Sequence, residues 1–172
     1  MIWIGLGTNQ GDRVGYMVQA VQAIQERGYD LHQLSSLYET APWGIEDQPS
    51  FLNAVAILEK KMEPLMLLDD LLEIEKEMGR IRLQKWGPRI IDIDIIDFQG
   101  EKWDHPRLQL PHPYAHTRSF VLAPMAELAP DYRLGDQEKT VQDWLKVLPE
   151  HSFDPYQDAS WAQLQLTIRN RS

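Results

Sequence analysis

The stretch that decides the fold is residues 85–96, which read KWGPRIIDIDII. From residue 90 onward it predicts a β-strand, because β-branched residues dominate and nothing before Phe98 interrupts them. Side chains of a strand alternate between its faces, so the isoleucines at positions 91, 93 and 95 fall on one side. Asp92 and Asp94 fall on the other side, with Cα atoms about 6.6 Å apart at the usual rise per residue.

Two carboxylates at this spacing can converge on a pair of divalent cations. Two-metal phosphoryl-transfer sites hold their ions about 3.5–4 Å apart, with such carboxylates around them. The alternative is a half-exposed strand with two solvated acids. Asp is depleted in strands, however, so two of them within a run of isoleucines indicate a function.

The residues just before the strand reverse the local charge. Arg80, Arg82, Lys85 and Arg89 stand between positions 80 and 89 without any acid, in a chain whose net charge is −9. A solvated basic loop would also give this pattern. Next to a carboxylate pair, it favours a polyanionic substrate whose charge is shared between metal ions and arginines.

The same stretch resembles the signature of a known enzyme family. Trp86-Gly87-Pro88-Arg89, two further residues and then Asp92-Ile93-Asp94 closely resemble the signature of the 6-hydroxymethyl-7,8-dihydropterin pyrophosphokinases of folate biosynthesis. The resemblance covers roughly residues 1–156. It implies that the pterin hydroxymethyl oxygen attacks the β-phosphorus of ATP and that AMP leaves.

The resemblance also implies which residues form the site. Asp92 and Asp94 would hold two Mg²⁺ ions, and the catalytic set would add Arg80, Arg82 and Arg89. The residues implied for ATP are Glu75, Arg80, Lys85, Trp86, Arg89, Arg107, His112 and Arg118. The residues implied for the pterin are Thr40, Ala41, Trp43, Phe51, Asn53, Asp92 and Phe120. The basic loop would neutralise the phosphates from one side, and His112 and Arg118 from the other, while the two phenylalanines would sandwich the ring.

Two of these expectations also have a basis in the pattern itself. A predicted strand over residues 51–60 points Phe51 and Asn53 the same way, and an aromatic face beside an amide suits a flat heteroaromatic ring. A core Phe with a capping Asn is the alternative. Glu75 lies at the end of a predicted helix over 64–78, where it would orient Arg80 or Arg89 or simply be solvated.

Two other segments carry weaker signals. Residues 105–118 hold three histidines and no acid, but no zinc-ligand pattern such as HExxH, so a zinc site is not favoured. The loop over residues 7–12 is rich in turn residues and could cradle a phosphate. It has no P-loop lysine and no GxGxxG, so it is read as a tight connection.

The composition excludes several classes of protein. A length of 172 residues is typical of one domain, and a net charge of −9 argues against general binding to nucleic acid or anionic membranes. The absence of cysteine excludes disulfides, thiolate zinc sites and a cysteine nucleophile. No signal peptide or membrane-spanning run is visible, so we expect a monomeric cytoplasmic protein whose partners are ATP and the pterin.

The order of predicted elements, β-α-β-β-α-β-β-α-α, indicates an α+β sandwich with a largely antiparallel central sheet and helices on its faces. The resemblance implies a ferredoxin-like variant. We expect a catalytic domain over 1–158 and a C-terminal extension over 159–172 that is an edge strand or disordered. Gln99-Gly100 should turn the chain into a hairpin strand near 101–103. Asp97 occupies a position expected to be apolar and should face away from Asp92 and Asp94.

Two other functions remain open. A two-metal phosphohydrolase or nuclease would share the acids and arginines, but it has no need of paired aromatics and an amide. A non-catalytic pterin- or nucleotide-binding protein would not need both Asp92 and Asp94.

Overall fold

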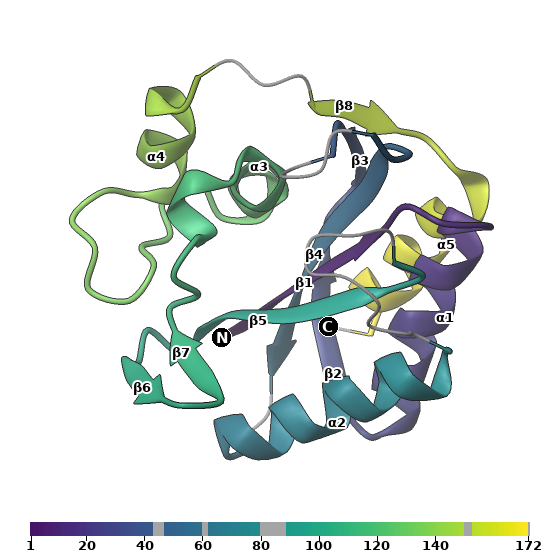
Figure 1. The fold of residues 1–172 in the computed structure, drawn as a ribbon, viewed down its shortest axis with the longest axis horizontal. Coiled ribbons are helices and arrows are strands. Elements are labelled where there is room, and N and C mark those ends of the chain that lie inside the picture. The colour runs from purple at the N-terminus through teal and green to yellow at the C-terminus, as the bar shows by residue number, and fades with distance from the viewer. Residues whose placement is uncertain (43–46, 60–61, 80–88, 150–152, 172) are drawn as a thin grey trace.

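The computed structural model describes residues 1–42, 47–59, 62–79, 89–149 and 153–171. An antiparallel sheet lies between two layers of helices, with strand order β5-β1-β4-β3-β8 and β2 also paired with β4 (Figure 1). The strands are β1 (Ile2–Thr8), β2 (Asp30–Leu34), β3 (Leu37–Thr40), β4 (Phe51–Glu59), β5 (Asp92–Phe98) and β8 (Phe153–Tyr156). A separate two-stranded sheet joins β6 (Trp103–His105) to β7 (Leu108–Leu110). The predicted α+β architecture is confirmed.

Helices cover both faces of the sheet. One face carries α1 (Arg13–Glu26), α2 (Pro64–Glu77) and α5 (Ala159–Arg169), and the other carries the 3-10 turn η1 (Ala115–Thr117), α3 (Ser119–Leu128) and α4 (Val141–Val147). A hydrophobic core lies on each face of the sheet, and β1 contributes side chains to both, because alternate side chains of a strand point to opposite faces. Ile2, Ile4 and Leu6 are buried beneath α1 and α2, whereas Trp3 is buried beneath α3. None of the described helices is long and apolar enough to cross a membrane.

Residues 30–34 and 37–40 form two strands on the same edge of β4. Leu34 lies opposite Ala56 and Tyr38 lies opposite Asn53, so β2 and β3 follow each other along one partner. The ladder is interrupted at residues 35–36, which form a corner.

The prediction that Asp97 faces away from the two other acids is wrong. A β-bulge shifts the register between β1 and β5, so that Trp3 pairs with Asp97 and Gly5 pairs with Asp94. A bulge inserts one extra residue into a strand. Side chains beyond the bulge therefore point to the face opposite to the one that strict alternation predicts. Asp97 therefore lies on the same face as Asp94. It is fully buried and accepts hydrogen bonds from Gly100 N at 2.9 Å, Gly135 N at 3.0 Å and the Tyr132 hydroxyl at 2.5 Å.

The short strand predicted after Gln99-Gly100 does form, at residues 103–105, but the predicted hairpin with β5 does not. Residues 103–105 pair with 108–110 and not with β5. The reason is that the chain turns again at once: Glu101 N donates to Phe98 O, and a second tight turn at 106–107 follows β6. The nearest strand with which β6 can pair is then β7, which follows it in the sequence.

The C-terminal extension is neither an edge strand nor disordered. Residues 159–169 form α5, whose N-cap Asp158 accepts from Trp161 N at 3.1 Å. Leu164, Leu166 and Ile168 alternate in the sequence, but Leu166 is half exposed. The buried residues Trp161 and Ile168 are seven apart, the spacing of two helical turns, which is the pattern that decides the structure here.

Candidate active site

The candidate site is built on two rows of residues that cross the sheet. In the first row, Asp92 of β5 pairs with Gly7 of β1, which pairs with Asn53 of β4. In the second row, Asp94 pairs with Gly5. Directly opposed residues point to the same face of a sheet, so the acid pair and Asn53 share one face, the one that α3 covers further along.

The floor between the acids and Asn53 is bare backbone, because β1 contributes only Gly5 and Gly7 there. A Cβ added at residue 7 would lie 2.9 Å from Asn53 Oδ1, and one added at residue 5 would lie 3.2 Å from Ile96 Cδ1. Sequence reasoning missed these two positions. The signal was a pair of glycines at i and i+2 within a strand, which marks a close approach to one face.

The amide of Asn53 is held in a fixed orientation. Its Nδ2 donates to Thr40 Oγ1 at 2.7 Å, and both residues are buried. Because the nitrogen is used in this way, Oδ1 is the atom that faces the glycine floor. Ala41, the next residue after Thr40, is exposed at the rim. The structure thus joins Thr40 to Asn53, which lies on the same face of the sheet as the acid pair.

Arg89 joins the acid side of the site to the ring side. Its Nη1 forms an ion pair with Asp92 Oδ2, and its guanidinium lies 5.8 Å from the centroid of the Phe51 ring. Both Arg89 and Asp92 are mostly shielded, with side-chain exposures of 17% and 21%. Arg89 therefore stands between the residue predicted to hold metal and one predicted to stack on the pterin.

Arg118 and His112 lie on the α3 side of the acids. Arg118 is buried, and its guanidinium lies 5.2 Å from the centroid of the Tyr114 ring and 5.6 Å from that of the Phe120 ring. Burial lowers the pKa of Arg118, while Asp94 and Asp92 oppose that shift. A guanidinium remains protonated under these conditions, so Arg118 is a buried cation that faces the two carboxylates.

His112 is neutral at pH 7. Burial, and then the charge of Arg118, lower the pKa of His112 to about 4, although Asp92 acts in the opposite direction. Its Nδ1 accepts from Tyr114 N at 3.1 Å, so the proton of the neutral ring is assigned to Nε2. His112 consequently offers a hydrogen-bond donor at Nε2, and its predicted contact with the ATP phosphates stays a prediction.

Asn9 is a buried residue that sequence reasoning did not single out. Its Oδ1 accepts from Arg89 N at 2.9 Å, and its Nδ2 donates to Gln48 Oε1 at 2.9 Å and Pro49 O at 3.1 Å. Asn9 thus fastens the residues that lead into β4 to those that lead into β5. A lone Asn in a turn-rich loop gives no sequence signal of this role.

Glu75 is buried in α2, with 3% of its surface exposed. Its Oε1 accepts from Ile93 N at 2.8 Å, between the two acids of β5. The alternative that Glu75 is solvated is therefore wrong. The hydrogen bond from Ile93 N to Glu75 supports the strand that carries Asp92 and Asp94. The predicted contact of Glu75 with ATP stays a prediction.

The structure does not bring every predicted residue into this cluster. Arg107 lies in the turn between β6 and β7, where it is ion-paired with Asp69 of α2. Five predicted site residues lie outside the described part of the chain: Trp43, Arg80, Arg82, Lys85 and Trp86.

The donor set fits magnesium bound together with a substrate. Mg²⁺ typically uses one or two carboxylates and completes its octahedral shell with water and substrate phosphates. Asp92 and Asp94 are half-buried carboxylates beside a floor without side chains, which leaves room for such ligands. Within the described residues, no group of three or more His, Cys, Asp or Glu side chains gathers into an all-protein cage.

Comparisons with known proteins show the family to which the chain belongs. Residues 3–130 match the family model described as 7,8-dihydro-6-hydroxymethylpterin-pyrophosphokinase. The 2-amino-4-hydroxy-6-hydroxymethyldihydropteridine pyrophosphokinase of Methylorubrum extorquens is 40% identical over 147 residues, which are 85% of this chain and 92% of that protein. The enzyme of the same name from Pseudomonas aeruginosa is 43% identical over 136 residues, or 78% and 84% of the two chains.

A solved structure shows the same fold. The wild-type HPPK-DHPS of Plasmodium falciparum superposes with a TM-score of 0.64 at 16% identity, and this chain spans 84% of its own length but 43% of that chain. The fold alone does not show the family, but the sequence matches do, because they cover most of this chain at about 40% identity. The chain therefore belongs to the 7,8-dihydro-6-hydroxymethylpterin-pyrophosphokinase family.

Proposed function

We propose that this chain transfers the pyrophosphoryl group of ATP to 6-hydroxymethyl-7,8-dihydropterin in folate biosynthesis. The hydroxymethyl oxygen forms a bond to the β-phosphorus and loses its proton, the bond from the β-phosphorus to the oxygen of the α-phosphate breaks, and AMP leaves. The observation that carries the proposal is the row Asp92–Gly7–Asn53, which sets an acidic site and an amide site side by side on a bare floor.

The acidic end is proposed to receive the triphosphate. Asp92 and Asp94 would hold two Mg²⁺ ions, which when bound supply charge stabilisation and in-line alignment of the phosphate oxygens. Arg118 and Arg89 place two cations next to these acids, and the Nε2–H of His112 adds an uncharged donor. The contribution of the protein is mostly positioning and electrostatic stabilisation.

The amide end is proposed to receive the pterin. Asn53 Oδ1 is an acceptor that faces the floor, which suits the N–H donors on the polar edge of a pterin. Thr40 and the exposed Ala41 border the same position. Phe51 and Phe120 would stack on the two ring faces, and each already has an arginine next to its ring, Arg89 and Arg118 respectively.

The remaining predicted roles belong to the same proposal. Arg80, Arg82, Lys85 and Trp86 would close the triphosphate side, and Trp43 would border the pterin. The protein would act as a monomer in the cytoplasm.

One assay tests the reaction. The protein is given ATP, Mg²⁺ and 6-hydroxymethyl-7,8-dihydropterin, and the released nucleotide is identified by chromatography. We expect AMP, formed only when the pterin is present. Release of ADP, or hydrolysis that does not depend on the pterin, would show a phosphohydrolase, and binding of both ligands without turnover would show a non-catalytic binding protein.

A further inference from the structure

The C-terminal segment supports the strand on the pterin side of the site. Residues 153–169 lie beyond the region 3–130 that matches the family model. Strand β8 pairs with the outer edge of β3 over its full length, from Leu37 opposite Tyr156 to Thr40 opposite Phe153. Without β8, β3 would be a four-residue strand at the edge of the sheet, a position that alone gives little stability.

Helix α5 then fixes the corner at which β3 begins. Trp161 Nε1 donates to Ser35 O at 3.0 Å, and Gln165 Nε2 donates to Leu34 O at 3.1 Å. Ser35 is fully buried and Trp161 is 2% exposed. A buried backbone carbonyl that leaves a β-ladder needs another donor, and at this corner α5 supplies it.

The hydrogen bonds of Ser35 show why its carbonyl needs α5. Ser35 N donates to Val55 O at 2.9 Å, but Val55 N donates to the Ser35 hydroxyl, also at 2.9 Å. The hydroxyl thus replaces the carbonyl as the acceptor facing β4. The carbonyl is turned toward α5, where the indole of Trp161 is its partner.

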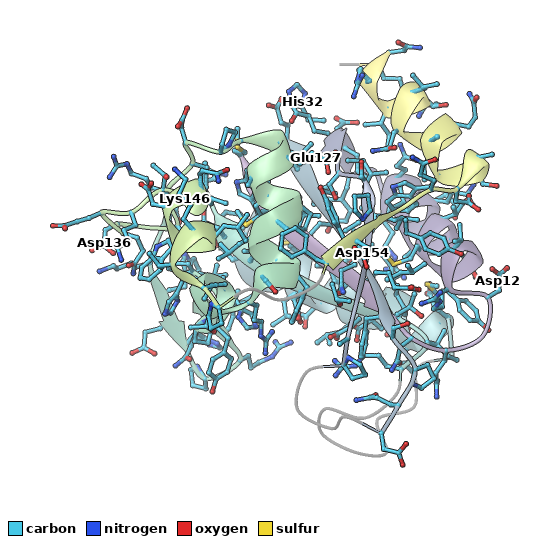
Figure 2. All side chains as sticks on the ribbon, turned by 90° about the horizontal axis from the view of Figure 1, so that it is seen from above. Asp12, His32, Glu127, Asp136, Lys146 and Asp154 are labelled. Carbon is cyan, nitrogen blue, oxygen red and sulfur yellow. The ribbon has the colours of Figure 1, made fainter. Side chains whose placement is uncertain are left out.

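The opposite face of the corner is held by α3. Glu127 accepts from Ser36 N at 3.0 Å, from the Ser36 hydroxyl at 3.0 Å and from the Tyr38 hydroxyl at 2.8 Å. Figure 2 shows Glu127 on α3, with α5 on the other side of the sheet. The start of β3 is therefore hydrogen-bonded from both faces of the sheet. The Glu127 carboxylate binds it on one face, and α5 binds it on the other.

Strand β3 in turn sets the amide end of the site. Tyr38 lies opposite Asn53 and Thr40 lies opposite Phe51, and Thr40 receives the hydrogen bond that orients Asn53. Asp92 and Asp94 lie on β5, on the far side of β1 and β4. A shift of β3 would consequently move Thr40, and with it the amide of Asn53, and leave the acid pair in place.

We infer that Trp161 and Gln165 are positioning residues for pterin binding, which act through the corner 34–35 and β3. The inference rests on the proposed function, since it assigns the amide end to the pterin. It gives the C-terminal helix a role in substrate affinity in addition to its role in packing.

The test removes both donors and keeps an aromatic ring and an apolar chain at the two positions, in the full-length double variant Trp161→Phe/Gln165→Leu. We expect the KM for the pterin to rise about fivefold, the effect of one net hydrogen bond, while the KM for ATP changes by less than about twofold. Gln165→Leu alone, at a half-buried position, should shift the pterin KM in the same direction by a smaller factor. Pterin affinity is also measured directly by calorimetry.

A matched control separates positioning from general loss of stability. Leu71 is fully buried on α2, so Leu71→Ala should lower the melting temperature at least as much, yet leave the pterin KM unchanged. The inference is overturned if the double variant keeps the wild-type pterin KM, or if the KM values for pterin and ATP rise together. Failure of the proposed function would look different, because the wild-type protein would then form no AMP with the pterin.

Discussion

At the scale of single residues, Asp92 and Asp94 share a face but have different surroundings. Asp92 is ion-paired with Arg89, and both acids act on the buried Arg118. Both acids are half-buried and border the glycine floor, so replacing either by Asn keeps the shape and removes one negative charge. We expect Asp92→Asn and Asp94→Asn each to lower kcat by more than about a hundredfold.

The fold should survive both substitutions, because neither carboxylate is part of the apolar core. The checks are steady-state release of AMP at saturating Mg²⁺ and the melting temperature of each variant. Leu71→Ala again serves as the comparison for a variant that loses stability and keeps its site. Turnover near the wild-type rate in either Asn variant would refute the assignment of two metals to this acid pair.

At the scale of elements, the central strand β1 pairs with β4 and β5, and its residues Gly5 and Gly7 form the floor of the candidate site. A Cβ at residue 7 would lie 2.9 Å from Asn53 Oδ1, which cannot move freely while Nδ2 is bonded to Thr40. We expect Gly7→Ala to weaken pterin binding by about tenfold through displacement of Asn53, with ATP affinity retained. Calorimetric titration with each ligand measures the two effects separately.

Gly5→Ala provides the matched control on the same strand. Its Cβ would lie 3.2 Å from Cδ1 of Ile96, the far end of a flexible side chain that can shift. Pterin affinity in this variant should therefore stay near the wild-type value. Equal losses in the two variants would show that the strand, and not the Asn53 contact, responds to added volume.

Asp97 follows the bulge in β5 and joins the turn after β5 to the segment between α3 and α4. The Tyr132 hydroxyl donates to this buried carboxylate at 2.5 Å, and burial together with this bond raises the pKa of Tyr132. Tyr132→Phe should lower the free energy of unfolding by about 1.5–3 kcal/mol, the usual contribution of a hydrogen bond to a charged group. Denaturant titration measures this loss.

Tyr38→Phe is the comparison for that prediction, because its hydroxyl also donates to a carboxylate, the more exposed Glu127. Its loss should cost less, about 1 kcal/mol or under. If the two variants were equally stable, Asp97 would not be the stabilising centre of this region.

At the scale of the whole molecule, His112 links stability to pH. Its pKa is about 4 in the folded protein, below the ordinary value of 6.5. Above pH 6.5 the ring is neutral in both states. Between pH 6.5 and 4 the unfolded chain binds a proton that the folded protein does not, so stability falls as pH falls, by up to about 1.4 kcal/mol per pH unit. Below pH 4 both states are protonated and the loss is complete.

The measurement compares the pH dependence of unfolding in the wild-type protein and in His112→Gln. Carboxylates also titrate in this range, so the quantity of interest is the difference between the two slopes. The variant should lose less stability than the wild type between pH 6.5 and 4. Identical slopes would mean that His112 has the same pKa in the folded and unfolded states.

The sequence by itself determined the acid strand, the order of most elements and the family. The run of isoleucines around two aspartates is decided by local strand propensity and by alternation, and both are properties of neighbouring residues. The same is true of α1 and α2, where buried positions recur at helical spacing and Gly28 and Gly79 follow the helix ends with positive φ.

Tertiary structure decided the features that depend on contacts between distant segments. The face of Asp97 depends on a bulge between β1 and β5, and the neutral charge state of His112 depends on its burial beside Arg118. The bare floor exists because Gly5 and Gly7 are paired with β4 and β5, which are dozens of residues away. The helical tail is docked on the sheet through Trp161, which donates to the buried carbonyl of Ser35, 126 positions earlier, and no local pattern in the sequence identifies such a partner.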